Sequence, residues 1–215
     1  KGEMRETDVF IIAGDAGYVW DEDYIYKVET LQQLFPGTVA FIDGNHENHM
    51  LLDSMEVVEW NGGKVHQVGE RVCHLMRGEL YSIYGCNIFT FGGARSSDID
   101  RRTEGESWWR EEEPSLEEID YGRNMLMEKA NEIDYVITHE TPLFARDHIS
   151  RSKEIDFDYH LPEILDDWYE TVSEGKRFKK WYFGHMHEDR QITPKLRAIH
   201  NDILIIGEDE PIKWA

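Results

Sequence analysis

The sequence is poor in cysteine and has no long apolar run. Its only cysteines, Cys73 and Cys86, form no CxxC pair, so we expect two reduced thiols and no disulfide framework. No apolar stretch approaches the roughly 18 residues that a membrane-spanning helix requires. No signal peptide is recognisable either. We therefore expect a soluble, cytoplasmic protein that has no membrane partner.

Positive charge is scarce as well. The chain has 23 Lys and Arg residues against 44 Asp and Glu residues, which gives a formal net charge of −21. This balance disfavours a broad electrostatic grip on DNA, RNA or an anionic membrane, and it disfavours a nuclease. It does not exclude a phosphorylated substrate, because a bound metal ion would be the largest local charge and would make the potential inside a site positive.

The rest of the composition is typical of a globular protein. The 215 residues are 40% hydrophobic and 12% aromatic, which is enough for a full hydrophobic core. No internal repeat, low-complexity tract or linker interrupts the sequence. We therefore expect a single domain over residues 1–215.

The first half of the chain predicts alternating strands and helices. Two apolar runs, residues 8–15 and 38–43, read as buried strands on either side of a helix over residues 21–35. This β-α-β order predicts parallel pairing. A short helix at residues 47–55 and a β-rich middle with a hairpin turn at Tyr84-Gly85 should follow.

The second half begins with a charge-rich insertion, residues 95–113, which we expect on the surface. We expect Trp108 and Trp109 to pack the insertion against the core, and a lid or an apolar partner patch is the alternative. Ser115 and Glu118 have the spacing of a capping box and predict a helix that runs to about residue 131. The remaining expected elements are a strand at 134–140, an amphipathic helix at 162–174, a strand at 179–187 and terminal β structure with a turn at Asn201-Asp202.

Each of the four buried strands is followed at once by a residue that can bind a metal. These residues are Asp15, Asn45, His139, His185 and His187. Because ligands bind beyond the carboxyl ends of parallel strands, neighbouring strands would bring one carboxylate, one amide oxygen and three imidazoles together. Such a set suits Mn, Fe, Zn, Ni or Co better than Ca or Mg.

The motifs around these residues, in this order, resemble those of the calcineurin-like metallophosphoesterases. They are Gly14-Asp15, the GNHE of residues 44–47, the strand-terminal His139 and the GHMH of residues 184–187. The resemblance implies an α/β fold, a four-layer α/β/β/α sandwich of two mixed sheets. It also implies a two-metal site that hydrolyses phosphomonoesters or phosphodiesters by means of a metal-bound hydroxide.

The resemblance assigns roles to these residues. Asp15 would bridge two divalent metals, Asn45, His139 and His185 would complete the ligands of one metal, and His187 would bind the other. His46 would be the catalytic residue that contacts the phosphate and stabilises the leaving group, and Asn45 and His46 would also bind substrate. Arg95, which follows a strand, is a further candidate for binding the substrate phosphate.

One family motif is missing from the sequence. No Asp-x-His precedes the first strand, so the metal site of His187 is incomplete and retains only Asp15 and His187. The chain begins at Lys1 without a methionine, close to where the missing strand would end, so we interpret the gap as N-terminal truncation. Natural loss of the motif is the alternative. Tyr18 also departs from the family, which often has an acidic or polar residue at that position.

Two functions follow from this pattern. The first is a metal-dependent phosphatase or phosphodiesterase, with manganese as a suitable metal and a phosphorylated small molecule or phosphoprotein as substrate. The second is a catalytically impaired interaction module that keeps the fold around an incomplete metal site. Outside the motifs, we expect His49 to be exposed and find no partner for His66 or His74.

Overall fold

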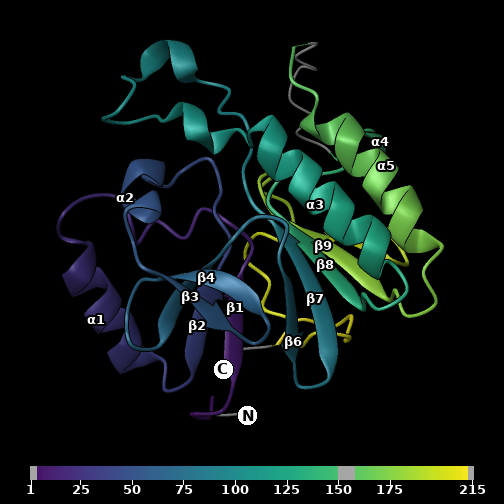
Figure 1. Ribbon diagram of the computed structural model, residues 1–215, viewed down its shortest axis with the longest axis horizontal. Helices are drawn as coiled ribbons and strands as arrows, with labels where there is room; N and C mark the ends of the chain where they lie inside the picture. The colour runs from purple at the N-terminus through teal and green to yellow at the C-terminus, as the bar shows by residue number, and fades with distance from the viewer. Residues whose placement is uncertain (1–3, 150–157, 213–215) are drawn as a thin grey trace.

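The computed structural model describes residues 4–149 and 158–212, which form two mixed β-sheets (Figure 1). The first sheet has the strand order β1-β2-β5-β4-β3. Its strands are β1 (Val9–Ile12), β2 (Thr38–Phe41), β3 (Val57–Trp60), β4 (Gly63–Gln67) and β5 (Val72–Leu75). β1, β2 and β5 are parallel, as the β-α-β pattern predicted, and β4 and β3 continue the sheet antiparallel.

The second sheet has the order β10-β11-β9-β8-β7-β6. Its strands are β6 (Leu80–Ile83), β7 (Cys86–Phe91), β8 (Tyr135–Thr138), β9 (Lys180–Phe183), β10 (Arg190–Thr193) and β11 (Leu196–Ala198). The four central strands β7, β8, β9 and β11 are parallel, and an antiparallel strand borders them on each side.

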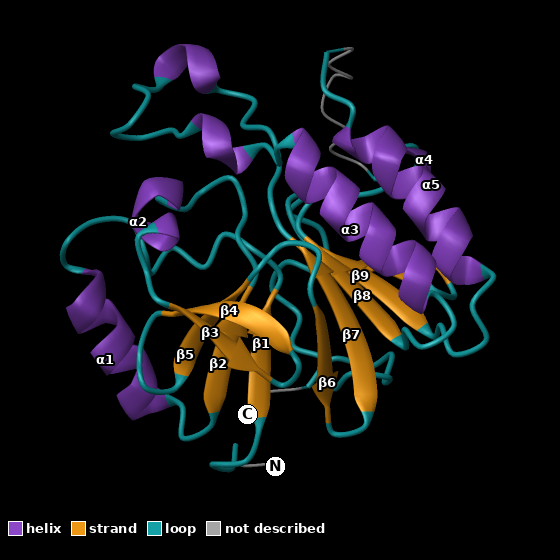
Figure 2. Cartoon of the chain, viewed as in Figure 1, coloured by secondary structure: helices purple, strands orange, loops and turns teal. Residues whose placement is uncertain are grey.

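Helices cover the outer face of each sheet (Figure 2). α1 (Tyr24–Leu34) and α2 (His49–Asp53) lie on the side of the first sheet, and α3 (Leu116–Lys129), α4 (Leu143–Arg146) and α5 (Leu161–Ser173) lie on the second. Three apolar clusters fill the three interfaces between these four layers. The predicted α/β/β/α sandwich is therefore confirmed.

The alternation of side chains along the central strands produces these layers. In β9, Trp181 and Phe183 pack among the helices, whereas Tyr182 between them faces the other sheet. In β2, Phe41 faces the helices and Ala40 faces the second sheet. Both faces of each strand are thus buried, which is why these segments read as continuous apolar runs in the sequence.

The predicted capping box and hairpin are present. The hydroxyl of Ser115 accepts a hydrogen bond from the backbone N–H of Glu118, and the Glu118 carboxylate accepts one from the backbone N–H of Ser115 at 2.8 Å. Tyr84 and Gly85 connect β6 to β7 with φ values of +50° and +78°. Two successive positive φ angles are those that a tight two-residue hairpin turn requires.

The predicted terminal β structure with a turn at Asn201-Asp202 is wrong. The last strands are β10 and β11, and described residues 199–212 contain no strand. β11 occupies the position beside β9, and the later apolar residues Ile199 and Leu204 pack as loop against the core between the sheets. At this end of the chain, the apolar pattern therefore predicted burial correctly, but it did not predict strand pairing.

The 95–113 insertion contains two short 3₁₀ turns, η1 (Ile99–Arg101) and η2 (Arg110–Glu112). Trp109 is buried and packs edge-on against Trp20, with ring centroids 5.0 Å apart. Packing of the insertion on the core is therefore confirmed for Trp109. No helix in the described ranges is long and apolar enough to span a membrane.

Candidate functional site

The candidate site lies where strand ends from both sheets meet. β1 and β2 carry Asp15 and Asn45 just beyond their ends, and β8 of the other sheet carries His139. The Nε2 atom of His139 lies 3.4 Å from Asp15 Oδ1 and 3.2 Å from Asn45 Oδ1. The sandwich therefore brings three of the five predicted metal ligands into direct contact, although their strands are split between two sheets.

Hydrogen bonds fix the atoms that these side chains present to one another. The Nδ1–H of His139 donates to the carbonyl oxygen of Ala13 at 2.8 Å, which leaves Nε2 facing Asp15 and Asn45. A backbone carbonyl at one ring nitrogen is the usual means of orienting a metal-binding histidine. His139 therefore directs its other nitrogen toward the two oxygens.

Asn45 is oriented by a relay from the insertion. Its Nδ2 donates to Ser96 Oγ at 3.0 Å, and the Ser96 hydroxyl donates to Glu112 Oε2 at 2.7 Å. An ionised Glu112 carboxylate can only accept hydrogen bonds, so the Ser96 hydroxyl must donate to it and accept from the Asn45 amide. The NH₂ group of Asn45 therefore points to Ser96, and its Oδ1 faces the site. Ser96 and Glu112 therefore position a candidate ligand from a segment that carries no family motif.

Glu47 joins the two loops that carry Asp15 and Asn45. Its carboxylate is fully buried and accepts backbone hydrogen bonds from Ala16 and Gly44, both at 2.6 Å. Burial and the nearby Asp15 carboxylate raise the pKa of Glu47 to about 7. Because both oxygens accept N–H groups, this residue acts as a bridge between the loops.

The backbone of the site is strained. Five described non-glycine residues have positive φ, and two of them, Asn61 and Tyr84, lie in hairpin turns. The other three are the candidate ligands Asp15 (+54°), His185 (+58°) and His187 (+53°). Such conformations cost on the order of 1–3 kcal/mol each and persist where the surroundings enforce them, typically at functional sites.

Two glycines are required by close packing in the site. A Cβ on Gly44 would overlap Asp15 Oδ1 and lie 2.8 Å from His139 Nε2. A Cβ on Gly14, which also has a positive φ of +90°, would overlap the ring of His139. The glycines of the GD and GNHE motifs therefore leave the space in which the three ligands meet.

His185 and His187 lie next in the arrangement. The ring of His185 packs edge-on against that of His139 with centroids 5.1 Å apart, and its Nε2 is 3.9 Å from the buried carboxylate of Glu140. His187 stacks on His200 with centroids 4.8 Å apart. The structure thus places His185 beside His139 of the candidate site and His187 against His200.

The electrostatics of the site favour a positive charge at its centre. Burial lowers the pKa of His139, but the Asp15 carboxylate, the hydrogen bond to Ala13 and the Glu47 carboxylate together outweigh burial and raise this pKa to about 9. Burial raises the pKa of Asp15, and the charge and hydrogen bond of His139 pull it well below its ordinary value. Two oxygens directed at one ring nitrogen are stabilised by a proton or a cation between them.

The donor set fits a divalent cation in part. Two ligands about 2.1 Å from one tetrahedral ion lie about 3.4 Å apart, and the separations of 3.2 and 3.4 Å around His139 Nε2 are of this size. The mixed oxygen and nitrogen donors suit Mn, Fe, Zn, Ni or Co. Across the described residues, however, no group of three or more His, Cys, Asp or Glu side chains is arranged to hold a metal ion. The fit therefore depends on the amide oxygen of Asn45.

His46, the predicted catalytic residue, borders this cluster. Its backbone N–H donates to Asp15 Oδ1 at 2.9 Å, and its Nδ1 lies 3.2 Å from Nη1 of Arg102. Arg95, the predicted phosphate ligand, forms ion-pair hydrogen bonds with Glu113 at 2.7 and 2.9 Å and lies over the ring of Tyr159. The substrate-binding role of Arg95 stays a prediction, and it would require this ion pair to rearrange.

A buried polar cluster lies next to the GNHE loop and corrects three expectations. His49 is buried, not exposed, and His66 and His74 pair with each other through their Nδ1 atoms at 2.9 Å. His74 Nε2 also contacts Asp43 Oδ1 at 3.1 Å, and Arg77 binds the other oxygen of Asp43. Sequence spacing did not show these contacts because they join different strands.

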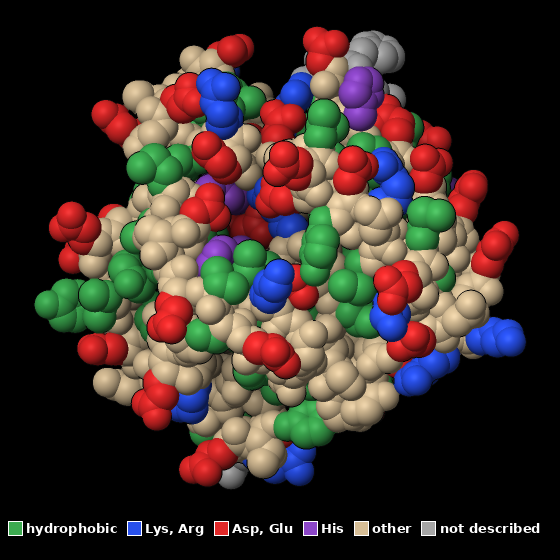
Figure 3. Space-filling view, viewed as in Figure 1, with side chains coloured by type: hydrophobic (Ala, Val, Ile, Leu, Met, Phe, Trp, Pro, Cys, Tyr) green, Lys and Arg blue, Asp and Glu red, His purple; other side chains and the backbone are tan. Residues whose placement is uncertain are grey.

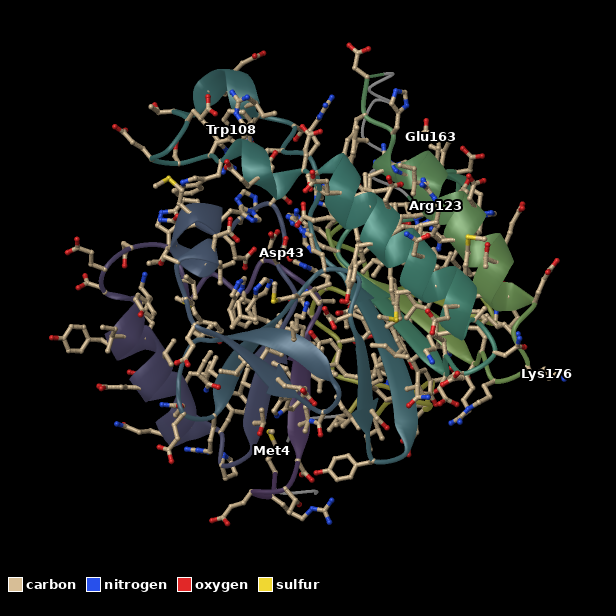
Figure 4. All side chains as sticks on the ribbon, viewed as in Figure 1. Met4, Asp43, Trp108, Arg123, Glu163 and Lys176 are labelled. Carbon is tan, nitrogen blue, oxygen red and sulfur yellow. The ribbon has the colours of Figure 1, made fainter. Side chains whose placement is uncertain are left out.

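This cluster lines a cavity of about 440 Å³. Figure 4 shows Asp43 at the centre of the molecule, and Figure 3 shows a hollow there in which acidic and histidine side chains are visible. Burial lowers the pKa values of His49 and His66 to about 4. His49 and His66 are therefore neutral at pH 7.

Sequence reasoning missed several residues that shape the site. Glu47 directly follows His46, the candidate catalytic residue, and Glu140 directly follows His139, a candidate ligand, so their positions in the sequence were a usable signal. Ser96, Arg102 and Glu112 lie in the insertion, where no periodicity or motif distinguished them. Their roles depend on how the insertion folds over the strand ends.

The comparison with known protein families agrees with this geometry. The model of the calcineurin-like phosphoesterase family matches residues 2–189, which include every candidate metal ligand and His46. A search of curated proteins found no match to the sequence. The family match covers most of the chain, and the chain therefore belongs to the calcineurin-like phosphoesterase family.

Proposed function

We propose that the chain is a metal-dependent phosphoesterase that hydrolyses phosphomonoesters or phosphodiesters. The observation that carries the proposal is the contact of Asp15, Asn45 and His139 at the strand ends, with separations of 3.2 and 3.4 Å. Family membership supports metal-dependent phosphoester hydrolysis in general. The strained backbone at Asp15 and His185 supports the same site.

The residues of the chain would have distinct tasks. Asp15, Asn45, His139 and His185 would hold a divalent cation, with His187 serving a second one. Such a cation supplies Lewis acidity and activates water near neutral pH. His46, whose backbone is anchored on Asp15, would donate a hydrogen bond to the phosphoryl or leaving-group oxygen and stabilise charge that develops there.

The acidic surface narrows the range of substrates. Carboxylates are spread over the face shown in Figure 3, and the net charge is −21. A long polyanion would be repelled, whereas a phosphorylated small molecule or a phosphoprotein segment presents few charges. We infer that substrates of the second kind are preferred.

A second function is supported by a specific observation. Among the described residues, no three His, Cys, Asp or Glu side chains are arranged as a metal site, and His187 stacks on His200. These features also fit a family member that binds metal weakly and acts as an interaction module. Metal stoichiometry and activity, measured on the same sample, separate the two functions.

The test combines metal binding with hydrolysis. Chelator-treated protein is titrated with Mn²⁺ in a calorimeter, and hydrolysis of p-nitrophenyl phosphate and bis(p-nitrophenyl) phosphate is measured with and without Mn²⁺. We expect at least one Mn²⁺ per chain and Mn²⁺-dependent hydrolysis. Asp15→Asn should weaken Mn²⁺ binding at least tenfold and lower kcat/KM by about 100-fold or more.

Asp100→Asn is the matched control, because Asp100 is an exposed carboxylate of η1. It should leave binding and hydrolysis unchanged, and circular dichroism should show both variants folded. Metal binding without hydrolysis would favour the interaction module. Hydrolysis unaffected by Asp15→Asn would contradict the proposed site.

A further inference from the structure

Arg102 reaches the candidate catalytic histidine from the insertion. Its Nη1 lies 3.2 Å from His46 Nδ1, and the same nitrogen donates to the carbonyl oxygen of Ser107 at 3.1 Å. Its Nε donates to Asp98 Oδ1 at 2.8 Å. The side chain is 17% exposed, so the guanidinium is largely enclosed and is held at three points.

The chemistry of arginine determines the direction of the contact with His46. A guanidinium has five N–H donors and no acceptor. The two hydrogens of Nη1 can therefore serve Ser107 and His46 separately, and His46 Nδ1 must be the acceptor. An imidazole that accepts at Nδ1 carries its proton on Nε2.

The neighbouring contacts also fix the backbone and the free ring nitrogen of His46. Its backbone N–H is bound to Asp15 Oδ1, which anchors the residue beside the candidate ligands. Within residues 4–149 and 158–212, Arg102 holds the His46 ring at Nδ1 alone, so Nε2 is the ring nitrogen that faces a substrate in our proposal. A mobile ring would have to find both the orientation and the tautomer in each catalytic cycle, at a cost in rate.

We propose that Arg102 is a positioning residue that holds the proton of His46 on Nε2, so that His46 meets the substrate phosphate as a hydrogen-bond donor. Asp98 and the Ser107 carbonyl fix Arg102, Arg102 fixes His46, and the insertion thereby completes the site. The catalytic part of this inference rests on the proposed phosphoesterase function. The tautomer itself does not, because it is a property of the metal-free chain.

The tautomer is read by long-range ¹H–¹⁵N correlation of the histidine rings in ¹⁵N-labelled, chelator-treated protein. His46→Gln assigns the His46 signals by their loss. In the unsubstituted protein we expect Nδ1 without a proton and Nε2 with one. Arg102→Met should give averaged signals of a tautomer mixture, and Arg102→Lys, which keeps a cationic donor group but lacks the guanidinium fork, should partly restore the Nε2–H form.

Kinetics supply the second readout. With Mn²⁺ and p-nitrophenyl phosphate, Arg102→Met should lower kcat about tenfold and leave KM within about twofold, because the lost hydrogen bond acts through His46. Arg101→Met is the matched control, since Arg101 is the adjacent, exposed arginine of η1. It should change neither the spectrum nor kcat. Asp98→Asn, which loosens Arg102, should give an intermediate tautomer mixture if Arg102→Met proves unstable.

The outcomes distinguish this inference from the proposed function. A protonated Nδ1 in the unsubstituted protein would overturn the inference, as would an unchanged spectrum in Arg102→Met or an equal loss of kcat in Arg101→Met. If the unsubstituted protein does not hydrolyse the substrate but keeps the Nε2–H form, the proposed function fails. The positioning by Arg102 is then still supported.

Discussion

At the scale of single residues, the site depends on groups that bind no ligand themselves. Glu47 is the clearest case, because its two oxygens accept backbone N–H groups of the loops that carry Asp15 and Asn45. An ionised carboxylate can accept on both sides, whereas an amide offers one oxygen and one NH₂ group. A neutral substitute of the same shape therefore tests whether Glu47 bridges the loops.

Glu47→Gln should lower the free energy of unfolding by about 2–3 kcal/mol. In the variant, an NH₂ group faces a buried backbone donor, which loses a hydrogen bond and leaves a polar group unpaired. Urea denaturation at pH 7.5 measures the change. The exposed Glu56→Gln is the control and should stay within about 0.5 kcal/mol of the unsubstituted protein. Equal stabilities of the two variants would show that Glu47 is not a structural bridge.

The positions of the candidate ligands were predictable because each residue lies in a motif just beyond the end of a strand. His139 contacts both Asp15 and Asn45, as the strand-end argument required. Arg102, Ser96 and Glu112 were not predictable, because the site residues that they reach or orient, His46 and Asn45, lie in a different loop far away in the sequence. The 43–47 loop shows the limit well: its GNHE was read correctly, yet the buried pairing of Asp43 with His74 went unseen.

At the scale of elements, short sequence motifs correctly predicted helix starts and turns that interactions within a few residues determine. The capping box of α3 and the turn at Tyr84-Gly85 were found because side-chain to backbone bonds and φ preferences act within a few residues. β3 was missed, although Asn61-Gly62 connects it to β4 through the same kind of turn. The terminal strand was misplaced because strand pairing is decided by distant partners, here β9 and β11.

The two hairpins give an element-scale prediction. Tyr84 holds φ +50° in the β6–β7 turn, where Asn61 holds φ +51° in the β3–β4 turn. Asparagine tolerates this conformation better than tyrosine, and Tyr84 is 73% exposed, so it has little packing to lose. Tyr84→Asn should therefore stabilise the protein by about 0.5–1 kcal/mol.

The matched substitution is Asn61→Tyr, which should destabilise by a similar amount for the same reason. Denaturant midpoints of the two variants are compared with that of the unsubstituted protein, at constant m-value. A lower midpoint for Tyr84→Asn would mean that the tyrosine ring contributes more than the turn conformation costs.

At the scale of the whole molecule, the sandwich and the net charge act in opposite directions. Three apolar clusters hold four layers together. The charge of −21, spread as carboxylates over the visible face (Figure 3), repels itself in the compact state. Because salt screens exposed charges over about 10 Å at 0.1 M, this repulsion should depend on ionic strength.

We expect the midpoint of thermal unfolding at pH 7.5 to rise by roughly 3–6 °C between 20 mM and 500 mM NaCl. Screening weakens repulsion among carboxylates more than it weakens the fewer ion pairs, since 44 acidic residues face 23 basic ones. Replacing the exposed Glu22, Glu29 and Glu170 by glutamine removes three negative charges, so it should raise the midpoint at low salt and flatten the salt dependence. A midpoint that falls with NaCl would mean that surface ion pairs such as Arg110–Glu104 outweigh the net repulsion. In that case the acidic surface would stabilise this fold through local pairs, and its main consequence for function would be the exclusion of polyanionic substrates.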